Sequence, residues 1–276
     1  MTIPPVWPSP HVVRLGVLGA VVEVQVTGDS AHAAWAEIQR VWHLCAAPDR
    51  ETAPDAVIHA VHDTASSTTN DLANGLVENS SLPDLLQMLT QAVTRAAIDA
   101  QAGRLVMLHA AGIQDPATGA VVALVGPGGT GKTTLIRTLG PGRGYITDET
   151  VAITDDHSVL PYPKPLSVRR RPHGPWKDET DPLHFGALAP TRPATLAAIV
   201  MLDRQDGYAG PPAVEAVATL DAIAALTPET SHLPEMEKPL QRMAALCDSV
   251  GGVVRVTYRE AEDLAPLLHG WWGADA

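Results

Sequence analysis

Cysteine and aromatic residues are scarce in this chain of 276 residues. The two cysteines, Cys45 and Cys247, lie far apart and form neither a CxxC pair nor part of a cysteine framework. This argues against a disulfide scaffold and favours a reduced compartment, in which both thiols pack as small apolar groups. With one phenylalanine and four tyrosines, the core must be built from alanine, valine, leucine and isoleucine.

Basic residues and long apolar runs are also scarce. There are 19 Lys and Arg against 31 Asp and Glu, and a formal net charge of −12 argues against nonspecific binding to nucleic acid or anionic membranes. No apolar run reaches the roughly 18 residues that a membrane-spanning helix needs. The N-terminus, MTIPPVWPSPHVV, lacks the basic and apolar regions of a secretory signal. We therefore expect a cytoplasmic protein without nucleic-acid or membrane partners.

The first hundred residues predict a small α/β domain. Apolar residues make up 45 % of the chain, which is typical of a globular protein, and the length suits one large or two modest domains. The pattern predicts strands over 12–26 and 57–61, a helix after Ser30, a polar surface connection over 64–79 and a helix from Ser81 to about Gly103. We place this domain, of unknown role, at 1–103.

The remainder, 104–276, predicts a second α/β domain. Short apolar, β-branched runs alternate with a helical pattern, which is typical of a sheet covered by helices. Proline and glycine cluster over 161–193, which suggests one long irregular loop. The expected strands are 105–110, 120–126, 144–147, 151–154, 196–203 and 253–257, and a helix is expected over 131–139.

A glycine-rich motif lies between an apolar strand and a helix in this second region. The run GPGGTGKT from Gly126 matches GxxxxGK[ST] in full, the pattern of a phosphate-binding P-loop. Glycines let the backbone N–H groups turn towards phosphate, and the helix N-terminus adds its positive dipole. Lys132 would reach the outer phosphates, and the Thr133 hydroxyl would ligate Mg²⁺. The predicted ATP- and Mg²⁺-binding residues are Gly126, Gly128, Gly129, Thr130, Gly131, Lys132, Thr133 and Thr134; a glycine-rich turn without a ligand is the alternative.

The residues around the motif discriminate among nucleotide-binding classes. No NKxD motif occurs, which argues against a common GTPase, and no LSGGQ motif occurs, which argues against an ABC ATPase. The acidic pair Asp148-Glu149 follows Lys132 by 16 positions (148 − 132), earlier than in standard ATPases. Asp203 ends the apolar run AAIVMLD and imitates a Walker B carboxylate, which would favour an ordinary ATPase.

Four segments together resemble the HPr kinase/phosphorylase superfamily, including its shorter members found beside peptide-modifying enzymes. They lie within about residues 104–204, and their order and spacing carry the resemblance. The resemblance implies a P-loop NTPase-type domain similar to the HPr kinase C-terminal domain. The segments are LHAAGI (108–113), GPGGTGKTTL (126–135), YITDETVAI (145–153) and PYPKPLSV (161–168).

The resemblance implies a role for each matching residue. His109 would line the phosphate site, Asp148 would act as general base on an acceptor hydroxyl, and Glu149 would help to hold Mg²⁺. Each has a structural alternative, since a histidine at a strand end can be inert and an acidic pair can begin a turn. Ala110 and Glu149 stand where the bifunctional enzymes carry Gly and Asp, so HPr is not the expected acceptor.

One basic segment interrupts the acidic chain, PKPLSVRRRPHGPWK over 163–177. Lys164 and Arg169 are candidates for contact with phosphate or an acidic acceptor, because Lys and Arg stabilise a transferring phosphoryl group. A solvated loop is the alternative. No aromatic interleaving suggests a nucleic-acid platform.

The sequence favours an ATP- and Mg²⁺-dependent kinase that phosphorylates a hydroxyl group on a small protein, peptide or metabolite. A nucleotide-binding accessory or scaffold protein and a simple ATPase remain alternatives. Members of the superfamily often assemble, so a homo-oligomer is also left open.

Overall fold

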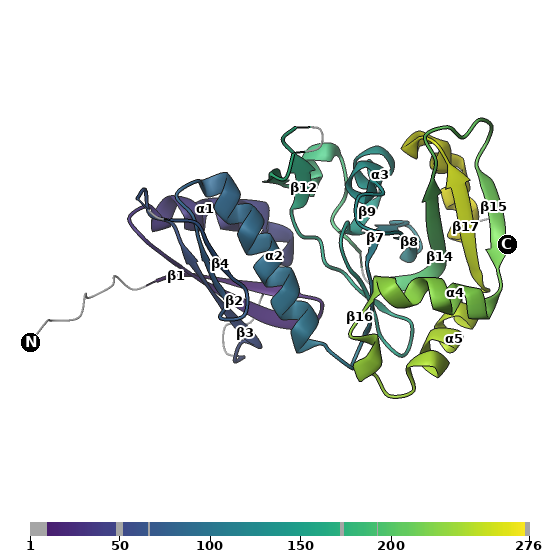
Figure 1. Ribbon diagram of the computed structural model, residues 1–276, viewed down its shortest axis with the longest axis horizontal. Helices are drawn as coiled ribbons and strands as arrows, with labels where there is room; N and C mark the ends of the chain where they lie inside the picture. Colours follow the sequence, from purple (N-terminus) through teal and green to yellow (C-terminus); the bar gives the residue numbers. More distant parts are fainter. Residues whose placement is uncertain (1–9, 48–51, 66, 172–173, 192, 274–276) are drawn as a thin grey trace, which may run out of the picture. The chain divides into compact units, whose positions relative to one another are not determined.

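The chain divides into two compact units in the computed structural model, which describes residues 10–47, 52–65, 67–171, 174–191 and 193–273 (Figure 1). The first unit runs to Ala100 and takes in Lys164–Asp181; the second comprises Gln101–Pro163 and the chain from Pro182. The predicted division at 103/104 placed 164–181 in the second domain, whereas the structure groups it with the first. The N-terminal segment 1–9 and residues 172–173 of the basic segment lie outside the described residues.

The first unit is a mixed five-stranded sheet with two helices, in the strand order β1-β2-β3-β5-β4. β1 and β2 form an antiparallel hairpin, as predicted, and β2, β3 and β5 run parallel. Buried residues alternate along β2, so one face of the strand is turned to the core. The elements are β1 (His11–Val17), β2 (Ala20–Thr27), α1 (Ala31–Val41), β3 (Ala56–Val61), β4 (Thr69–Asp71), β5 (Leu76–Glu78) and α2 (Leu82–Ala100).

Two expectations for this unit are corrected. The polar stretch 64–79 contains β4 and β5, whose antiparallel pairing outweighs the low strand propensity of its Ser, Thr and Asn residues. The basic segment holds a hairpin, β12 (Leu166–Arg169) and β13 (Lys177–Thr180), instead of an irregular loop. The side chain of Gln87 on α2 accepts a 2.7 Å hydrogen bond from the Lys177 N–H, so α2 holds the hairpin in the first unit.

The second unit is built on a six-stranded sheet in the order β15-β17-β14-β8-β7-β9, in which β8, β14 and β17 run parallel. A four-stranded sheet, β11-β10-β6-β16, accompanies it. The strands of the two sheets are β6 (Val106–Leu108), β7 (Ala110–Gln114), β8 (Ala120–Val125), β9 (Gly144–Thr147), β10 (Val151–Ile153), β11 (Val159–Leu160), β14 (Thr195–Arg204), β15 (Ala213–Val217), β16 (Thr230–Ser231) and β17 (Val253–Tyr258).

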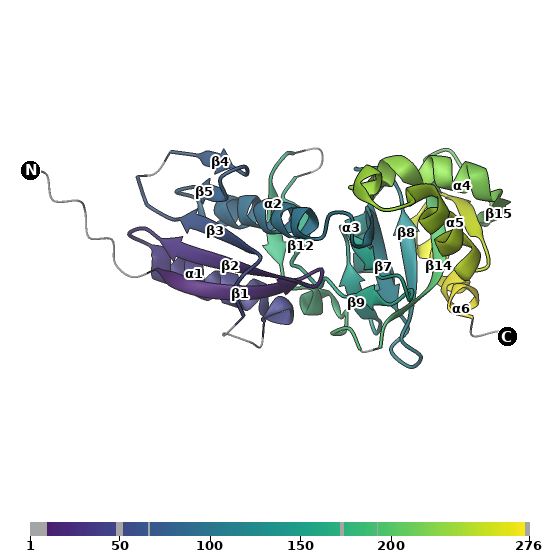
Figure 2. The same ribbon diagram turned by 90° about the horizontal axis from the view of Figure 1, so that it is seen from below.

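The helices of the second unit fall into two groups. α3 (Lys132–Leu139) packs on β7 and on the 3₁₀ helix η5 (Ala261–Leu267), and Figure 2 shows it beside β7 and β8. α4 (Thr219–Leu226) and α5 (Pro239–Ser249) contact each other, and α6 (Leu268–Trp271) contacts η5. Short 3₁₀ helices occupy several connections: η1 (His43–Cys45) in the first unit and η2 (Pro182–Phe185), η3 (Thr227–Glu229) and η4 (Leu233–Glu235) in the second.

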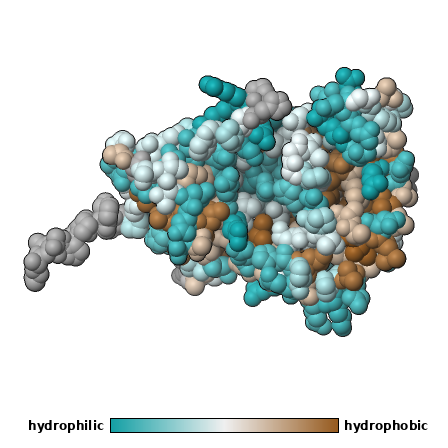
Figure 3. All heavy atoms as spheres, in the orientation of Figure 1, coloured by the Kyte–Doolittle hydropathy of each residue, from teal (hydrophilic) through white to brown (hydrophobic). Residues whose placement is uncertain are grey.

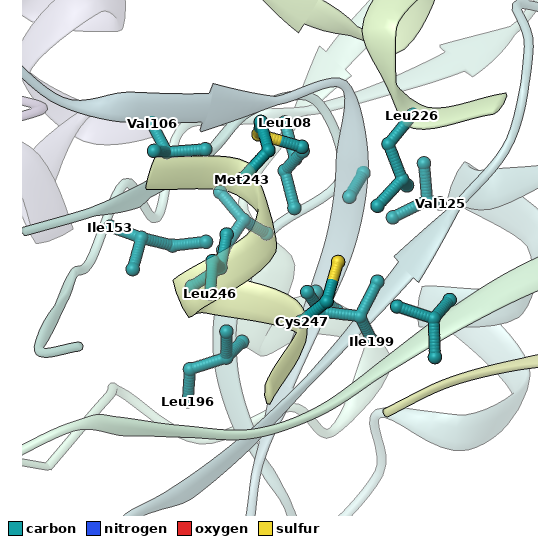
Figure 4. Close-up of a cluster of buried hydrophobic side chains, with 14 of the residues drawn as sticks. Val106, Leu108, Val125, Ile153, Leu196, Ile199, Leu226, Met243, Leu246 and Cys247 are labelled. Carbon is teal, nitrogen blue, oxygen red and sulfur yellow. The ribbon is translucent and has the colours of Figure 1, made fainter. Parts of the chain in front are cut away.

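The core of the second unit is aliphatic, as the scarcity of phenylalanine predicts. Buried side chains of β6, β8, β14 and β17 meet those of α4 and α5 in one cluster, in which Met243, Leu246 and Cys247 come from α5 (Figure 4). Burying one such aliphatic side chain contributes about 1.5–3 kcal/mol to folding. The cluster therefore fixes the sheet from which the glycine-rich motif projects.

Large apolar side chains also reach the surface of the second unit. Leu220 on α4 is 81 % exposed and Leu240 on α5 is 60 % exposed. Figure 3 shows hydrophobic residues gathered over the part of this unit that carries α4 and α5. None of the helices within the described ranges is long and apolar enough to cross a membrane.

Candidate functional site

The glycine-rich loop, residues 126–131, connects β8 to α3 at the carboxyl end of β8. Gly129 and Gly131 have φ values of +91° and +92°, which residues with a Cβ rarely adopt. A Cβ added to Gly128 or Gly129 would meet no atom within 4 Å, so the loop presents bare backbone to open space. A loop with this backbone can approach an anion closely, and a side chain at Gly128 would occupy that space.

The loop is braced from within by its own side chains. The Thr130 hydroxyl donates to the Pro127 carbonyl at 2.5 Å. The ammonium of Lys132, whose side chain is buried, donates to the carbonyls of Gly126 and Pro127, the latter at 3.3 Å. The lysine thus lies against the loop whose ligands it is predicted to hold.

Thr133 at the start of α3 contacts the first residue of the acidic pair. Its hydroxyl donates a 2.7 Å hydrogen bond to Asp148, and the Tyr145 hydroxyl donates to the other carboxylate oxygen at 3.1 Å. β8 and β9 both run antiparallel to β7, so their carboxyl ends share one edge of the sheet. The loop after β8 and Asp148 after β9 therefore meet, and Asp148 is only 3 % exposed there.

The sequence analysis did not anticipate Tyr145, although a signal for it exists. Tyr145 precedes Asp148 by three residues in YITD, and its ring is buried in β9. A buried tyrosine hydroxyl needs a polar partner, and the carboxylate of Asp148, three residues further along the chain, can be that partner.

Glu149 and His109 form the second pair of the site. Nδ1 of His109 lies 3.5 Å from Oε1 of Glu149, and the two side chains are 31 % and 38 % exposed. The Thr147 hydroxyl accepts the N–H groups of Glu149 and Thr150 at 3.0 and 3.3 Å, which shapes the turn between β9 and β10. Because about a third of each side chain is exposed, His109 and Glu149 are accessible to solvent, whereas Asp148 is buried.

Strand pairing brings this pair together. His109 lies between β6 and β7, and Glu149 lies between β9 and β10. β6 pairs with β10 while β7 pairs with β9. The β6–β7 and β9–β10 segments therefore pass from one sheet to the other side by side. The Ala110 N–H donates to the Glu149 carbonyl at 3.2 Å and joins the two crossings.

Asp203, the alternative metal carboxylate, is the penultimate residue of β14, the strand that pairs with β8. Its Oδ2 accepts hydrogen bonds from Thr257 at 3.0 Å and from Gln205 at 2.8 Å. The carboxylate in contact with the Thr133 hydroxyl is that of Asp148.

The candidates of the basic segment belong to the first unit. Lys164 is 1 % exposed and donates to the Pro165 carbonyl at 3.0 Å and to the Ser167 hydroxyl at 3.4 Å. Ser167 in turn donates to Glu179 at 2.8 Å. Arg169 donates to the Gly174 carbonyl at 2.7 Å. These contacts stabilise the hairpin, and a role of Lys164 or Arg169 towards phosphate stays a prediction.

Neither the family models nor the curated proteins with which the chain was compared match it. The chemistry of the site therefore rests on its own residues. Within the described ranges, no group of three or more His, Cys, Asp or Glu is placed to hold a metal ion. Mg²⁺ in nucleotide sites is held by one or two carboxylates together with phosphates and water, so a hydroxyl and a carboxylate in contact suit it.

Proposed function

We propose that the chain is an ATP- and Mg²⁺-dependent phosphotransferase that phosphorylates a hydroxyl group of a peptide, a small protein or a metabolite. Its second unit would then be a P-loop domain similar to that of HPr kinase. The observation that carries the proposal is the hydrogen bond between Thr133 and Asp148 beside the glycine-rich loop. It joins the hydroxyl predicted to ligate Mg²⁺ to a buried carboxylate, which is the pairing that a Mg²⁺-nucleotide site needs.

The loop and α3 supply the phosphate contacts. Backbone N–H groups of 126–131 and the ammonium of Lys132 would bind the β- and γ-phosphates, and the N-terminus of α3 adds its dipole. The Thr133 hydroxyl and Asp148 would hold Mg²⁺. The metal, when bound, neutralises the charge that develops on the phosphate oxygens.

The exposed pair supplies the proton acceptor. The sequence favours Asp148 as base and Glu149 as metal carboxylate, but the contacts of Asp148 support the exchanged roles. Glu149 is more exposed, so an acceptor hydroxyl can approach it, and His109 lies where it can orient its carboxylate.

The transfer step moves one proton, forms one bond and breaks one bond. Glu149 takes the proton of the acceptor hydroxyl while the oxygen of that hydroxyl forms a bond to the γ-phosphorus. The bond from the γ-phosphorus to the bridging oxygen breaks, and ADP leaves with that electron pair. Positioning and charge neutralisation supply most of the rate acceleration in such a reaction.

Paired carboxylate variants test the proposal. Asp148→Asn should weaken Mg²⁺-dependent ATP binding, measured by titration calorimetry with and without Mg²⁺. Glu149→Gln should keep that affinity and lose transfer from radiolabelled ATP to a set of serine- and threonine-containing peptides. The reverse pattern would return the base role to Asp148.

Two outcomes would reject the proposal in different ways. Wild-type protein that binds ATP tightly but transfers no phosphate to peptides, small hydroxyl compounds or water would be an accessory nucleotide-binding protein. Acceptor-independent hydrolysis that is lost in Asp203→Asn and kept in Asp148→Asn would indicate a simple ATPase.

A further inference from the structure

A pocket of about 200 Å³ borders the glycine-rich loop within the second unit. One side consists of residues from the loop and the first turn of α3, and the other of the last residues of β14 and β17 and the segment that follows β17. Pockets for drug-sized ligands measure roughly 300–1,000 Å³, so this one accommodates only part of a nucleotide. The lining residues that carry the argument are Thr130, Thr134, Arg204, Tyr258, Glu260 and Glu262.

Tyr258 is the unusual member of this lining. Its side chain is 1 % exposed, and its hydroxyl forms no hydrogen bond with any described residue. Burial raises the pKa of this phenol to about 12, so it stays protonated and able to donate. A buried hydroxyl without a partner destabilises the protein. Because Tyr258 also lines the pocket, a ligand in the pocket can supply the missing partner.

The charges around the pocket indicate which part of a nucleotide can enter. Arg204 is already engaged, since Nε donates to the Arg259 carbonyl at 3.0 Å and Nη2 lies 3.1 Å from Asp206 and 3.9 Å from Glu260. Glu260 and Glu262 add carboxylates to the wall. Carboxylates repel phosphate but accept hydrogen bonds from ribose hydroxyls and base amino groups.

We propose that this pocket receives the nucleoside, base and ribose, of the nucleotide whose phosphates lie on the glycine-rich loop, and that the Tyr258 hydroxyl hydrogen-bonds to it. The proposal rests on the proposed function, because it assumes that the ligand of the loop is a nucleotide. Thr130, Gly131 and Thr134 belong both to the loop or its helix and to the pocket wall, so a ligand held by its phosphates extends directly into the pocket.

Tyr258→Phe tests this inference because it keeps the ring and removes only the hydroxyl. With Mg²⁺ present, calorimetry should show that the variant binds ATP about three- to tenfold more weakly, the loss expected for one hydrogen bond. Binding of inorganic tripolyphosphate, which has no nucleoside, should be unchanged. The ligand-free variant should melt at a higher temperature than wild type, because the orphan hydroxyl is gone.

Two further variants separate the possible failures. Tyr208→Phe is the matched control, since the Tyr208 hydroxyl donates to the Pro211 carbonyl at 3.0 Å and Tyr208 is not among the residues that line the pocket; its ATP affinity should equal that of wild type. Lys132→Ala should weaken the binding of ATP and of tripolyphosphate by similar factors, a result that would support the phosphate site.

If wild type binds both ligands but Tyr258→Phe binds ATP equally well, the nucleoside pocket is wrong and the phosphate site stands. Equal weakening of ATP and tripolyphosphate by Tyr258→Phe would also overturn it, since Tyr258 would then support the loop. Wild type that binds neither ligand would overturn the proposed function itself, and the pocket with it.

Discussion

The hydroxyl of Thr133 donates a 2.7 Å hydrogen bond to Asp148, and this contact joins the helix after β8 to the end of β9. Between β8 and β9 lies β7, which is antiparallel to both. β8 and β9 therefore run in the same direction, and their carboxyl ends lie at the same edge of the sheet. A second hydroxyl, that of Tyr145, holds the same carboxylate from within β9. The orientation of Asp148 towards the loop is thus set before any ligand is bound.

Thr133→Ala should weaken Mg²⁺-dependent ATP binding by about tenfold or more, because it removes both a proposed metal ligand and a hydrogen bond to a carboxylate. Calorimetric titrations with and without Mg²⁺ measure the effect. Thr138→Ala, the same change further along α3, should bind as wild type does. Equal affinities for Thr133→Ala and Thr138→Ala would remove the metal role.

Gly128→Ala should abolish tight nucleotide binding with little change in melting temperature. Its Cβ would meet nothing within 4 Å in the structure, so the fold should tolerate it. The same Cβ would occupy the space into which phosphate oxygens must fit. Wild-type ATP affinity in this variant would argue against phosphate binding by the loop.

Gly112→Ala should show the opposite pattern. On β7, an added Cβ would lie 2.8 Å from the Cβ of Ile146 and 3.1 Å from a methyl group of Val151, both in the core. Overpacking of this kind costs about 1–3 kcal/mol, which urea unfolding can measure. A stability equal to that of wild type would mean that β7 and β9 lie less closely together than described.

Lys164→Ala should reduce turnover if the ammonium contacts phosphate, and it should also cost stability because the lysine is buried against Ser167. Ser167→Ala is the matched control, since it cuts the same network of Lys164 and Glu179 but keeps the ammonium. Peptide phosphorylation and urea unfolding should be measured for both. Equal losses in the two variants would assign Lys164 a purely structural role.

Both cysteines should be unreactive towards a thiol reagent in the native protein and react fully in denaturant. Burial raises the pKa of the Cys45 thiol and, with Asp248 nearby, that of Cys247. The folded protein therefore holds these protons more tightly than the unfolded chain does. Their contribution to stability is complete below the ordinary value of 9.0 and is lost as the pH rises above it.

Urea unfolding between pH 7 and pH 10 measures this loss, and comparison with Cys45→Ala isolates one thiol. The variant should show a shallower decline of the unfolding free energy above pH 9 than wild type. Identical slopes would contradict a raised pKa of the Cys45 thiol, and rapid labelling of the native protein would show that at least one of the two thiols is accessible to solvent.

Local patterns accounted for part of the fold. The hairpin over 12–26, the helix after Ser81 and the strand before Gly126 all follow from periodicity and turn residues within a few positions of one another. The chain from 205 to 252, with β15, α4 and α5, was not predicted, because its short elements are stabilised by packing on the central sheet. The β12–β13 hairpin was missed for the same reason, since α2 supports it from about ninety residues away in the chain.

The sequence by itself determined the glycine-rich loop, the aliphatic core and the presence of an acidic pair after a short strand, because each depends on residues that are neighbours in the chain. Only the tertiary structure decided which carboxylate meets Thr133 and that Glu149 pairs with His109. It also decided that Tyr258 lines a pocket beside the loop while its hydroxyl has no partner among the described residues. These relationships depend on strand order and direction. The order β14-β8-β7-β9 comes from the pairing of distant segments, which no pattern within a single segment encodes.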